Sequence, residues 1–154
     1  LDMHIHDSDW LTSAFGLPAS VTSRGVKLPT GWDYLATQYD YPEGATITAR
    51  GGWCLPSGSP FRMTYQAVFT EGTLEFDSRR ESPLLRTTPK GTETVTTESS
   101  RDPLIAYRAQ LGYFVSCLQK GKPVERSTGQ QARDSLRLVL AEIRSAEAQQ
   151  PTAI

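Results

Sequence analysis

The chain has 154 residues and an almost balanced charge, with 16 lysines and arginines against 17 aspartates and glutamates. This length fits one domain with a substantial core, and the charge gives no indication of a nucleic-acid or anionic-membrane partner. No apolar run reaches the ~18 residues of a membrane span and the polar start is unlike a signal peptide, so we expect a cytoplasmic protein with no membrane partner.

The first predicted element is a short helix over residues 2–15. Ile5, Trp10 and Leu11 supply apolar positions at mixed three-to-four spacing, and Gly16 followed by Pro18 is typical of a helix end. The chain enters this element without an initiator methionine. We therefore expect a fragment of a longer protein.

Residues 19–97 change to the period-two pattern of strands. Tight turns are predicted at residues 42–44 and 71–72, where proline or glycine favours a reversal, so the strands should form an antiparallel meander. Gly51-Gly52 lies within a strand and suggests a bulge. The predicted strand segments are ASVTSRGV (19–26), DYLATQYDY (33–41), ATITARGGW (45–53), FRMTYQAVF (61–69), TLEFDS (73–78), LLRTT (84–88) and TETVTT (92–97).

The last third of the chain predicts two helices. The first follows Pro103, with Ser100 or Asp102 as its cap, and the second begins at a Thr128–Gln131 capping box. Residues 148–154 read as a frayed tail. The apolar face of the first helix is Leu104, Tyr107, Leu111, Phe114 and Leu118, and that of the second is Ala132, Leu136, Val139, Ile143 and Ala146.

This order of elements predicts an α+β fold, an open and mainly antiparallel sheet with helices packed on one face. The other face would be bare, and an exposed apolar area usually marks a partner surface. The strand residues that could expose such an area are Tyr34, Tyr39, Tyr41, Ile47, Trp53, Tyr65 and Phe69.

The opening LDMHIHDSDW holds both histidines of the chain, and a metal site is one interpretation. On a strand, His4 and His6 would point to the same face. Zinc and iron sites of this type need further histidines, and the sequence has none after His6. The metal interpretation is therefore the less favoured one.

On a helix, Asp2, His6 and Asp9 fall within a ~60° sector, whereas His4 lies ~160° from His6. A carboxylate beside a histidine orients the ring and fixes its tautomer, which would suit His6 for general acid–base catalysis. The alternative is a helix N-terminus with acidic residues near the positive dipole end and a surface histidine. The spacing alone leaves both interpretations open.

Other catalytic motifs are missing from the sequence. It has no Gly-x-Gly-x-x-Gly or P-loop segment and no nucleophile elbow. Cys54 and Cys117 lack the spacing of a zinc or redox pair, so we expect free thiols that pack against neighbouring apolar residues.

The segment LDMHIHDSDWLTSAFGLPASVTSRG resembles the start of the C-terminal domain of the Gfo/Idh/MocA oxidoreductases, the family of glucose–fructose oxidoreductase and inositol dehydrogenase. That family typically reads Asp-x-Gly-x-His-x-x-Asp, and Asp2, His6 and Asp9 occupy its three polar positions. EGTLEFDS resembles a family strand, and YRAQLGYFVSCLQKGKP and QQARDSLRLVLAEIRSAE resemble its two closing helices. The resemblance covers nearly the whole chain.

The resemblance implies a dihydrodipicolinate-reductase-like C-terminal domain over residues 1–154, preceded in the full-length protein by a Rossmann domain that binds NAD or NADP. The substrate would be a sugar or cyclic polyol, reacting at a secondary alcohol or ketone. His6 and Asp2 would be the catalytic residues, and Asp9 would bind the substrate or hold the helix in place. The bare sheet face would carry a homo-oligomer contact.

Two features depart from the family pattern. His4 stands where glycine is common, and no lysine lies in the family's Glu-Lys-Pro-like motif. Without the Rossmann domain, this chain alone should neither bind a nicotinamide cofactor nor turn over. A non-catalytic, sheet-mediated dimerisation or scaffold domain is therefore the alternative function, and a small metal hydrolase built on the two histidines is a third.

Overall fold

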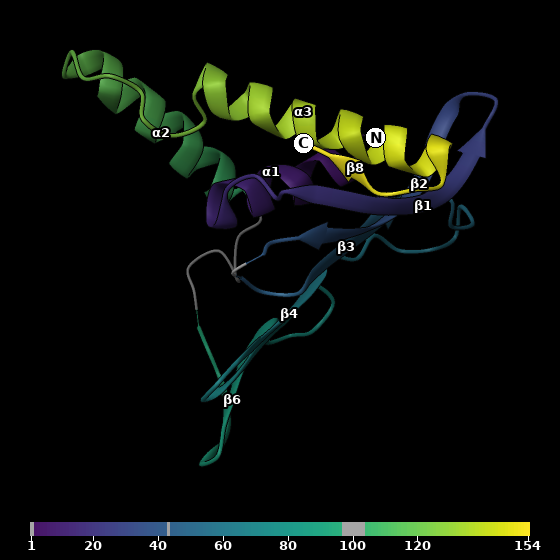
Figure 1. The fold of residues 1–154 in the computed structure, drawn as a ribbon. Coiled ribbons are helices and arrows are strands. Elements are labelled where there is room, and N and C mark those ends of the chain that lie inside the picture. Colours follow the sequence, from purple (N-terminus) through teal and green to yellow (C-terminus); the bar gives the residue numbers. More distant parts are fainter. Residues whose placement is uncertain (1, 43, 97–103) are drawn as a thin grey trace. The chain divides into compact units, whose positions relative to one another are not determined.

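The computed structural model describes residues 2–42, 44–96 and 104–154. Its elements follow the predicted order of one helix, a run of strands and two helices, so the α+β fold class is confirmed (Figure 1). The elements are α1 (His4–Phe15), β1 (Ser20–Leu28), β2 (Gly31–Asp40), β3 (Ile47–Gly52), β4 (Thr64–Phe69), β5 (Gly72–Asp77), β6 (Leu84–Thr88), β7 (Gly91–Thr94), α2 (Ile105–Gln119), α3 (Gly129–Ala148) and β8 (Thr152–Ala153).

The strands form two four-stranded sheets in place of the single predicted one. Their orders are β3-β2-β1-β8 and β4-β5-β6-β7, and every pair is antiparallel. The chain divides into two compact units. Unit 1 comprises Leu1–Ser57 and Glu125–Ile154, and unit 2 comprises Gly58–Val124.

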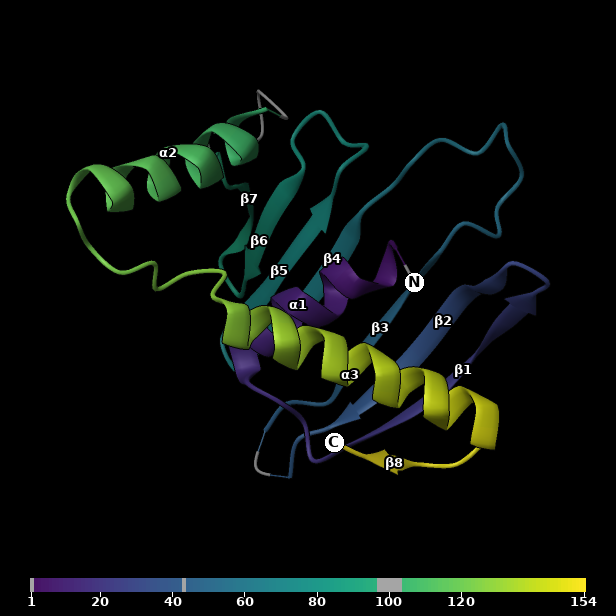
Figure 2. The ribbon, with the colours of Figure 1, turned by 90° about the horizontal axis from the view of Figure 1, so that it is seen from above.

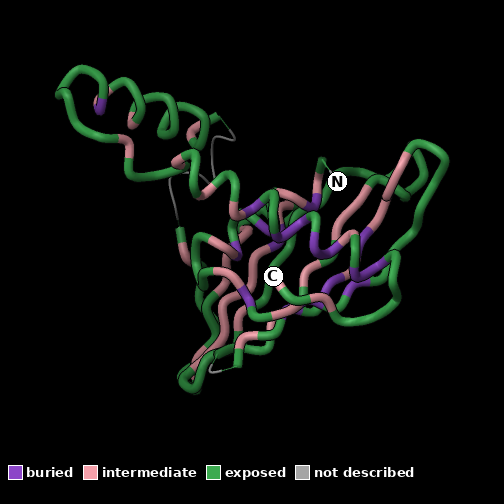
Figure 3. Tube along the Cα trace, turned by 45° about the horizontal axis from the view of Figure 1, so that its top comes forward, coloured by how far each residue is buried: buried purple, intermediate pink, exposed green. Residues whose placement is uncertain are grey.

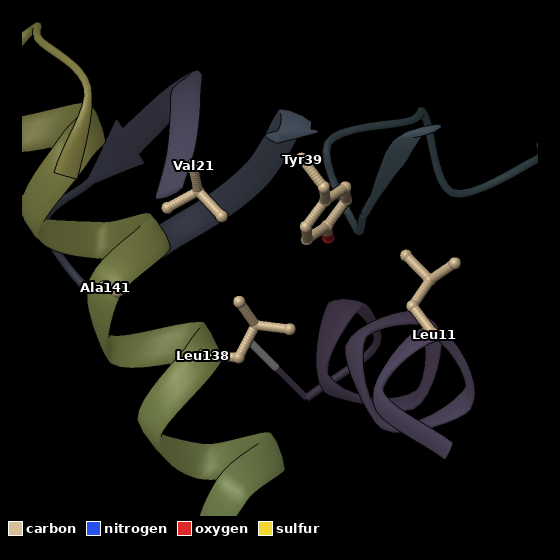
Figure 4. Packing of buried hydrophobic residues seen from close by; sticks show 5 residues of the cluster. All are labelled: Leu11, Val21, Tyr39, Leu138 and Ala141. Atoms are coloured by element: carbon tan, nitrogen blue, oxygen red, sulfur yellow. The ribbon is translucent and has the colours of Figure 1, made fainter. Parts of the chain in front are cut away.

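In unit 1, α1 and α3 cover one face of the sheet (Figures 1 and 2). Val21 pairs with Tyr39 and Ser23 pairs with Thr37 across β1 and β2. Because alternate residues of a strand point to the same face, both pairs point toward the helices. The core cluster takes a residue or two from each of four elements (Figure 4). Its members are Leu11, Val21, Tyr39, Leu138 and Ala141.

The ends of α1 differ slightly from the prediction. The helix begins at His4, so Asp2 lies in the preceding turn and is not part of the helix. It ends as predicted at Gly16, whose φ of 76° suits glycine and whose N–H donates to the Thr12 carbonyl.

The capping box predicted for α3 is present. Thr128 accepts from the Gln131 backbone N–H, and the Gln131 side chain accepts from the Thr128 N–H. The predicted fraying of the tail is wrong, because Thr152 and Ala153 pair with β1 as β8. Gln149 in the left-handed region ends the helix and lets the chain turn back, and Ile154 packs against the core.

The buried face of α3 is also rotated from the predicted one. Val139 and Ala146 are buried as expected, whereas Leu136 is exposed and Glu142 is fully buried. Apolar periodicity misses this face because three of its buried residues are polar: Ser135, Glu142 and Ser145.

Unit 2 contains the β4–β7 sheet and α2. Tyr65 and Phe76 stack across β4 and β5 at 5.6 Å between ring centroids, and Arg62 donates twice to Asp77. The predicted apolar face of α2 is exposed. Its cap candidates, Ser100 and Asp102, lie outside the described residues, as does Glu43 of the first predicted turn.

Three further expectations need correction. Tyr39 faces the core and cannot belong to a bare sheet face. Cys54 is exposed, whereas Cys117 is buried as expected and both thiols are free. Gly51 and Gly52 pair in regular register with β2 without a bulge. Gly52 instead allows the backbones of β2 and β3 to approach closely, because a Cβ on Gly52 would lie 2.1 Å from the Asp33 carbonyl oxygen.

Candidate functional site

Glu142 of α3 lies at the centre of a polar cluster inside unit 1. Its carboxylate is fully buried and receives hydrogen bonds from α1 and β2. Oε1 accepts from Ser8 Oγ at 2.9 Å and from the Tyr39 hydroxyl at 3.1 Å. Oε2 accepts from Thr37 Oγ1 at 3.4 Å, and His4 Nε2 lies 2.6 Å from it in an ion-pair contact. We call these five residues the Glu142 cluster.

Three hydrogen-bond donors and the His4 ring surround this one carboxylate, which explains how it is held away from water. A buried carboxylate is tolerated when its acceptor sites are filled by hydrogen-bond donors. Burial first, and then the charge of Glu142, raise the pKa of Tyr39, so its hydroxyl keeps the proton that it donates. The Glu142 cluster therefore joins α1, β2 and α3 at a single point.

His4 is the buried histidine of the pair. Because Nε2 lies against Glu142 and 3.4 Å from the Tyr39 hydroxyl, the other ring nitrogen, Nδ1, faces outward from the cluster. Nδ1 is buried without a hydrogen-bond partner in the part of the chain that the structure describes, and Asp7 Oδ2 lies 3.8 Å away. His4, which the helical spacing predicts to lie on another face than His6, is buried in the core.

Asp7 forms the surface side of this arrangement. Its side chain is half exposed, and burial raises its pKa while the neighbouring His4 and His6 oppose that shift. Gly51 of β3 leaves room for it, since a Cβ there would lie 3.1 Å from Asp7 Oδ2 and 3.7 Å from His4 Nδ1.

The three residues predicted for the site lie in α1 and in the turn before it, and all three are exposed. Asp2 and His6 are exposed, in the turn before α1 and in its first turn. Asp9 instead accepts a hydrogen bond from Ser135 Oγ at 2.6 Å, which ties α1 to α3. Asp9 thus links the two helices, and its predicted role in binding substrate stays a prediction.

A shallow cleft of about 290 Å³ lies beside Asp9, in unit 1. It is lined largely by hydroxyl, amide and carboxylate groups, which suit a polar ligand with several hydroxyls. The lining residues are Asp9, Thr12, Ser13, Gly16, Leu17, Ser127, Gln131, Asp134 and Ser135.

The structure separates the two histidines, one buried and one exposed, so they do not form the side-by-side pair of the metal interpretation. Among the described residues, no group of three or more His, Cys, Asp or Glu side chains could hold a metal ion. No helix in the same residues is long and apolar enough to cross a membrane.

Sequence reasoning missed Glu142 and Tyr39. The signal for Glu142 was a charged residue between Leu138, Ala141 and Ala146, where an apolar face would otherwise be continuous. Tyr39 gave no comparable signal, because tyrosine is common on both faces of strands.

The fold of this chain is similar to that of several solved oxidoreductase structures. No family model and no curated protein sequence matches the chain, whereas solved structures do. An oxidoreductase from Agrobacterium radiobacter, in complex with NAD+, L-tartaric acid and magnesium, matches 97% of this chain and 47% of its own, with 20% identity and a TM-score of 0.78. A levoglucosan dehydrogenase in complex with NADH and levoglucosan matches 99% and 49%, with 16% identity and a TM-score of 0.76.

The WlbA dehydrogenase from Bordetella pertussis, in complex with NADH and UDP-GlcNAcA, matches 98% of this chain and 46% of its own, with 16% identity and a TM-score of 0.69. The chain thus spans about half the length of the solved structures that it matches. It has the fold of one half of these oxidoreductases, as the resemblance to the C-terminal domain of the Gfo/Idh/MocA family predicts.

Proposed function

We propose that the chain is the C-terminal, substrate-binding domain of an NAD(P)-dependent oxidoreductase that acts on a secondary alcohol or ketone of a sugar or cyclic polyol. The observation that carries this proposal is the exposed pair Asp2 and His6 at the start of α1, a helix that is otherwise fixed in the core through His4, Ser8 and Asp9. Two structures with this fold contain a sugar or sugar nucleotide beside NADH.

The cofactor would bind outside this chain, because the sequence has no glycine-rich loop for the pyrophosphate. NAD or NADP supplies the hydride acceptor or donor when bound. During oxidation, the exposed imidazole of His6 takes the proton of the substrate hydroxyl, and during reduction it returns that proton. Asp2 orients His6 or accepts a hydrogen bond from a neighbouring hydroxyl.

Asp9 would contribute to substrate binding from the cleft. Ser135 occupies only Oδ1 of the carboxylate, and an ionised carboxylate has about four acceptor sites. The remaining sites can accept from substrate hydroxyls, together with Thr12 and Ser13 in the same cleft. Asp9 would then serve both of its predicted roles.

The test uses the full-length protein that carries this chain with its nicotinamide-binding domain, assayed for NAD(P)H formation on a panel of sugars and polyols. We expect His6→Ala to lower kcat about 10²- to 10⁴-fold, the usual contribution of a general acid–base group. Asp9→Asn should mainly raise KM, by about tenfold for a weakened hydrogen bond to a charged group.

Asp40→Asn is the matched control, because Asp40 is an exposed carboxylate at the end of β2 whose contact is with Ser20. Its kinetics should equal those of the unmodified protein. Full activity in both His6→Ala and Asp2→Asn would contradict the catalytic assignment. Absence of activity on every substrate would instead favour the second candidate function.

That second candidate is a dimerisation or scaffold domain. It is favoured by the exposed apolar side chains of β4, Tyr65, Val68 and Phe69, because exposed apolar areas often mark partner surfaces. In this view, a homo-oligomer forms through the β4–β7 sheet. Sedimentation velocity over a wide concentration range tests it, and a monomer at every concentration would exclude self-association.

A further inference from the structure

The Glu142 cluster fixes how α1 is turned about its own axis. His4 and Ser8 are four residues apart, so both lie on one side of the helix. Both contact the same carboxylate, His4 by an ion pair and Ser8 by a hydrogen bond. Residues two positions apart on a helix point about 200° apart. Holding His4 in the core therefore directs His6 away from it, which agrees with the exposure of His6.

Stability alone does not account for the charge on Glu142. Replacing a buried ion pair by well-packed apolar residues is often neutral or stabilising, whereas a pair with several hydrogen bonds can select one arrangement over others. The cluster joins three elements, since His4 and Ser8 belong to α1, Tyr39 and Thr37 to β2, and Glu142 to α3. An apolar contact at this point would let α1 rotate or slide.

We propose that Glu142, acting through His4 and Ser8, is the positioning residue that sets the orientation of His6 and Asp2 at the start of α1. This inference rests on the proposed function for its catalytic consequence. The placement of α1 that it describes can be measured independently in the 154-residue chain.

Two substitutions separate a positioning role from simple packing. Glu142→Gln keeps the shape of the side chain but replaces one acceptor oxygen by a donor nitrogen, so it removes the ion pair with His4 and part of the acceptor capacity for the hydroxyl donors. His4→Leu removes the polar contact with Glu142, whereas His4→Gln keeps an N–H group at a similar reach. Ser145→Ala is the control, because the Ser145 hydroxyl hydrogen-bonds to β1 and to Gln150 and, among the described residues, makes no hydrogen bond to α1.

The first measurement uses diethyl pyrocarbonate, which modifies accessible imidazoles, on the 154-residue chain. The chain has only two histidines, so we expect one fast reaction at His6 and one protected site at His4. Glu142→Gln should expose His4 to fast reaction, whereas Ser145→Ala should leave it protected. Mass mapping of the modified residues distinguishes the two sites.

The second measurement is the kinetics of the full-length enzyme. Glu142→Gln and His4→Leu should lower kcat by about 10²-fold, the effect of a displacement of about 1 Å, with KM changed much less. His4→Gln should restore most of kcat, and Ser145→Ala should keep it. If His4→Leu does not fold, the comparison of Glu142→Gln with His4→Gln decides.

Protection of His4 in Glu142→Gln would overturn the positioning role, whether or not the enzyme is active. Exposure of His4 in Glu142→Gln with unchanged kcat would show that the Glu142 cluster only stabilises the fold. This result would also overturn the positioning role. If the full-length protein has no dehydrogenase activity, the proposed function fails, and the modification experiment still decides whether Glu142 sets the placement of α1.

Discussion

The two units of the chain bury their side chains very differently (Figure 3). Among the described residues, unit 2 has only two buried residues, Cys117 and Asp77, and all the other buried residues belong to unit 1. In unit 1, two helices pack on one face of the sheet, so side chains are enclosed between the helices and the strands. Both sheets are four-stranded and antiparallel. Among the described residues, however, only unit 1 has a core that can hold a polar cluster in place.

The distribution of tryptophans makes this comparison measurable. Trp10, Trp32 and Trp53 are the three tryptophans of the chain, and all lie in unit 1. Tryptophan fluorescence therefore follows the unfolding of unit 1, while far-UV circular dichroism follows both units. Urea unfolding recorded with both signals separates the effects of the following substitutions.

The largest expected effect is from the core of unit 1. Leu138→Ala removes a side chain with no exposed surface and should lower the free energy of unfolding by about 2–5 kcal/mol, the usual cost of such a cavity. Val68→Ala on β4 is the matched change in unit 2, where 73% of the side chain is exposed. It should change the free energy of unfolding by about 0.5 kcal/mol or less. Equal losses in the two variants would contradict the difference between the units.

An intermediate effect is expected from two adjacent glycines of β3. Gly52→Ala would place a Cβ 2.1 Å from the Asp33 carbonyl oxygen, and backbone cannot move aside easily, so we expect a loss of about 1–3 kcal/mol. Gly51→Ala comes close only to the half-exposed Asp7 side chain, at 3.1 Å, and makes ordinary contacts with His4 at 3.7 Å or more, so it should cost much less. Both losses of stability are obtained from the urea midpoint of the tryptophan fluorescence transition. A larger loss in Gly51→Ala than in Gly52→Ala would show that the Asp7 side chain cannot move aside.

The smallest effect is expected from the ion pair of unit 2. Hydrogen bonds from Arg62, and then from the Arg79 N–H, lower the pKa of Asp77 from its ordinary value of 3.8 to about 2. Because the pKa is lower in the folded state, the pair stabilises unit 2 above pH ~4 and loses this effect as the pH falls toward 2. Arg62→Gln should therefore lower the circular-dichroism midpoint slightly at pH 6 and hardly at all near pH 2.

The tryptophan transition should be the same in Arg62→Gln as in the unmodified chain at both pH values, since the ion pair lies within unit 2. A shift of both signals would show that the two units unfold together. In that case the free energies above would refer to the whole chain.

The sequence predicted the elements well because their signals are local. Gly16 and Pro18 predicted the end of α1, and the Thr128–Gln131 spacing predicted the start of α3. The sequence failed where a partner distant in the sequence decides the outcome. Glu142 and Ser8 are 134 positions apart, and no local pattern shows that a glutamate will find its polar partners in the core.

The candidate site shows the same division between local and distant information. Asp2, His6 and Asp9 remain the predicted site, and the residue that fixes their helix in the core was not foreseen. The tail was misjudged for a similar reason: Thr152 pairs with Val21, at the other end of the sequence.

The sequence by itself determined the α+β order, the helix end at Gly16, the capping box at Thr128 and the period-two strands, because these depend on residues within about four positions of one another. Only the tertiary structure decided that His4 is buried and His6 exposed, although they are two residues apart. The physical reason is the cost of an unpaired buried charge. His4, Ser8, Tyr39 and Thr37 can satisfy the Glu142 carboxylate only after α1, β2 and α3 have come together.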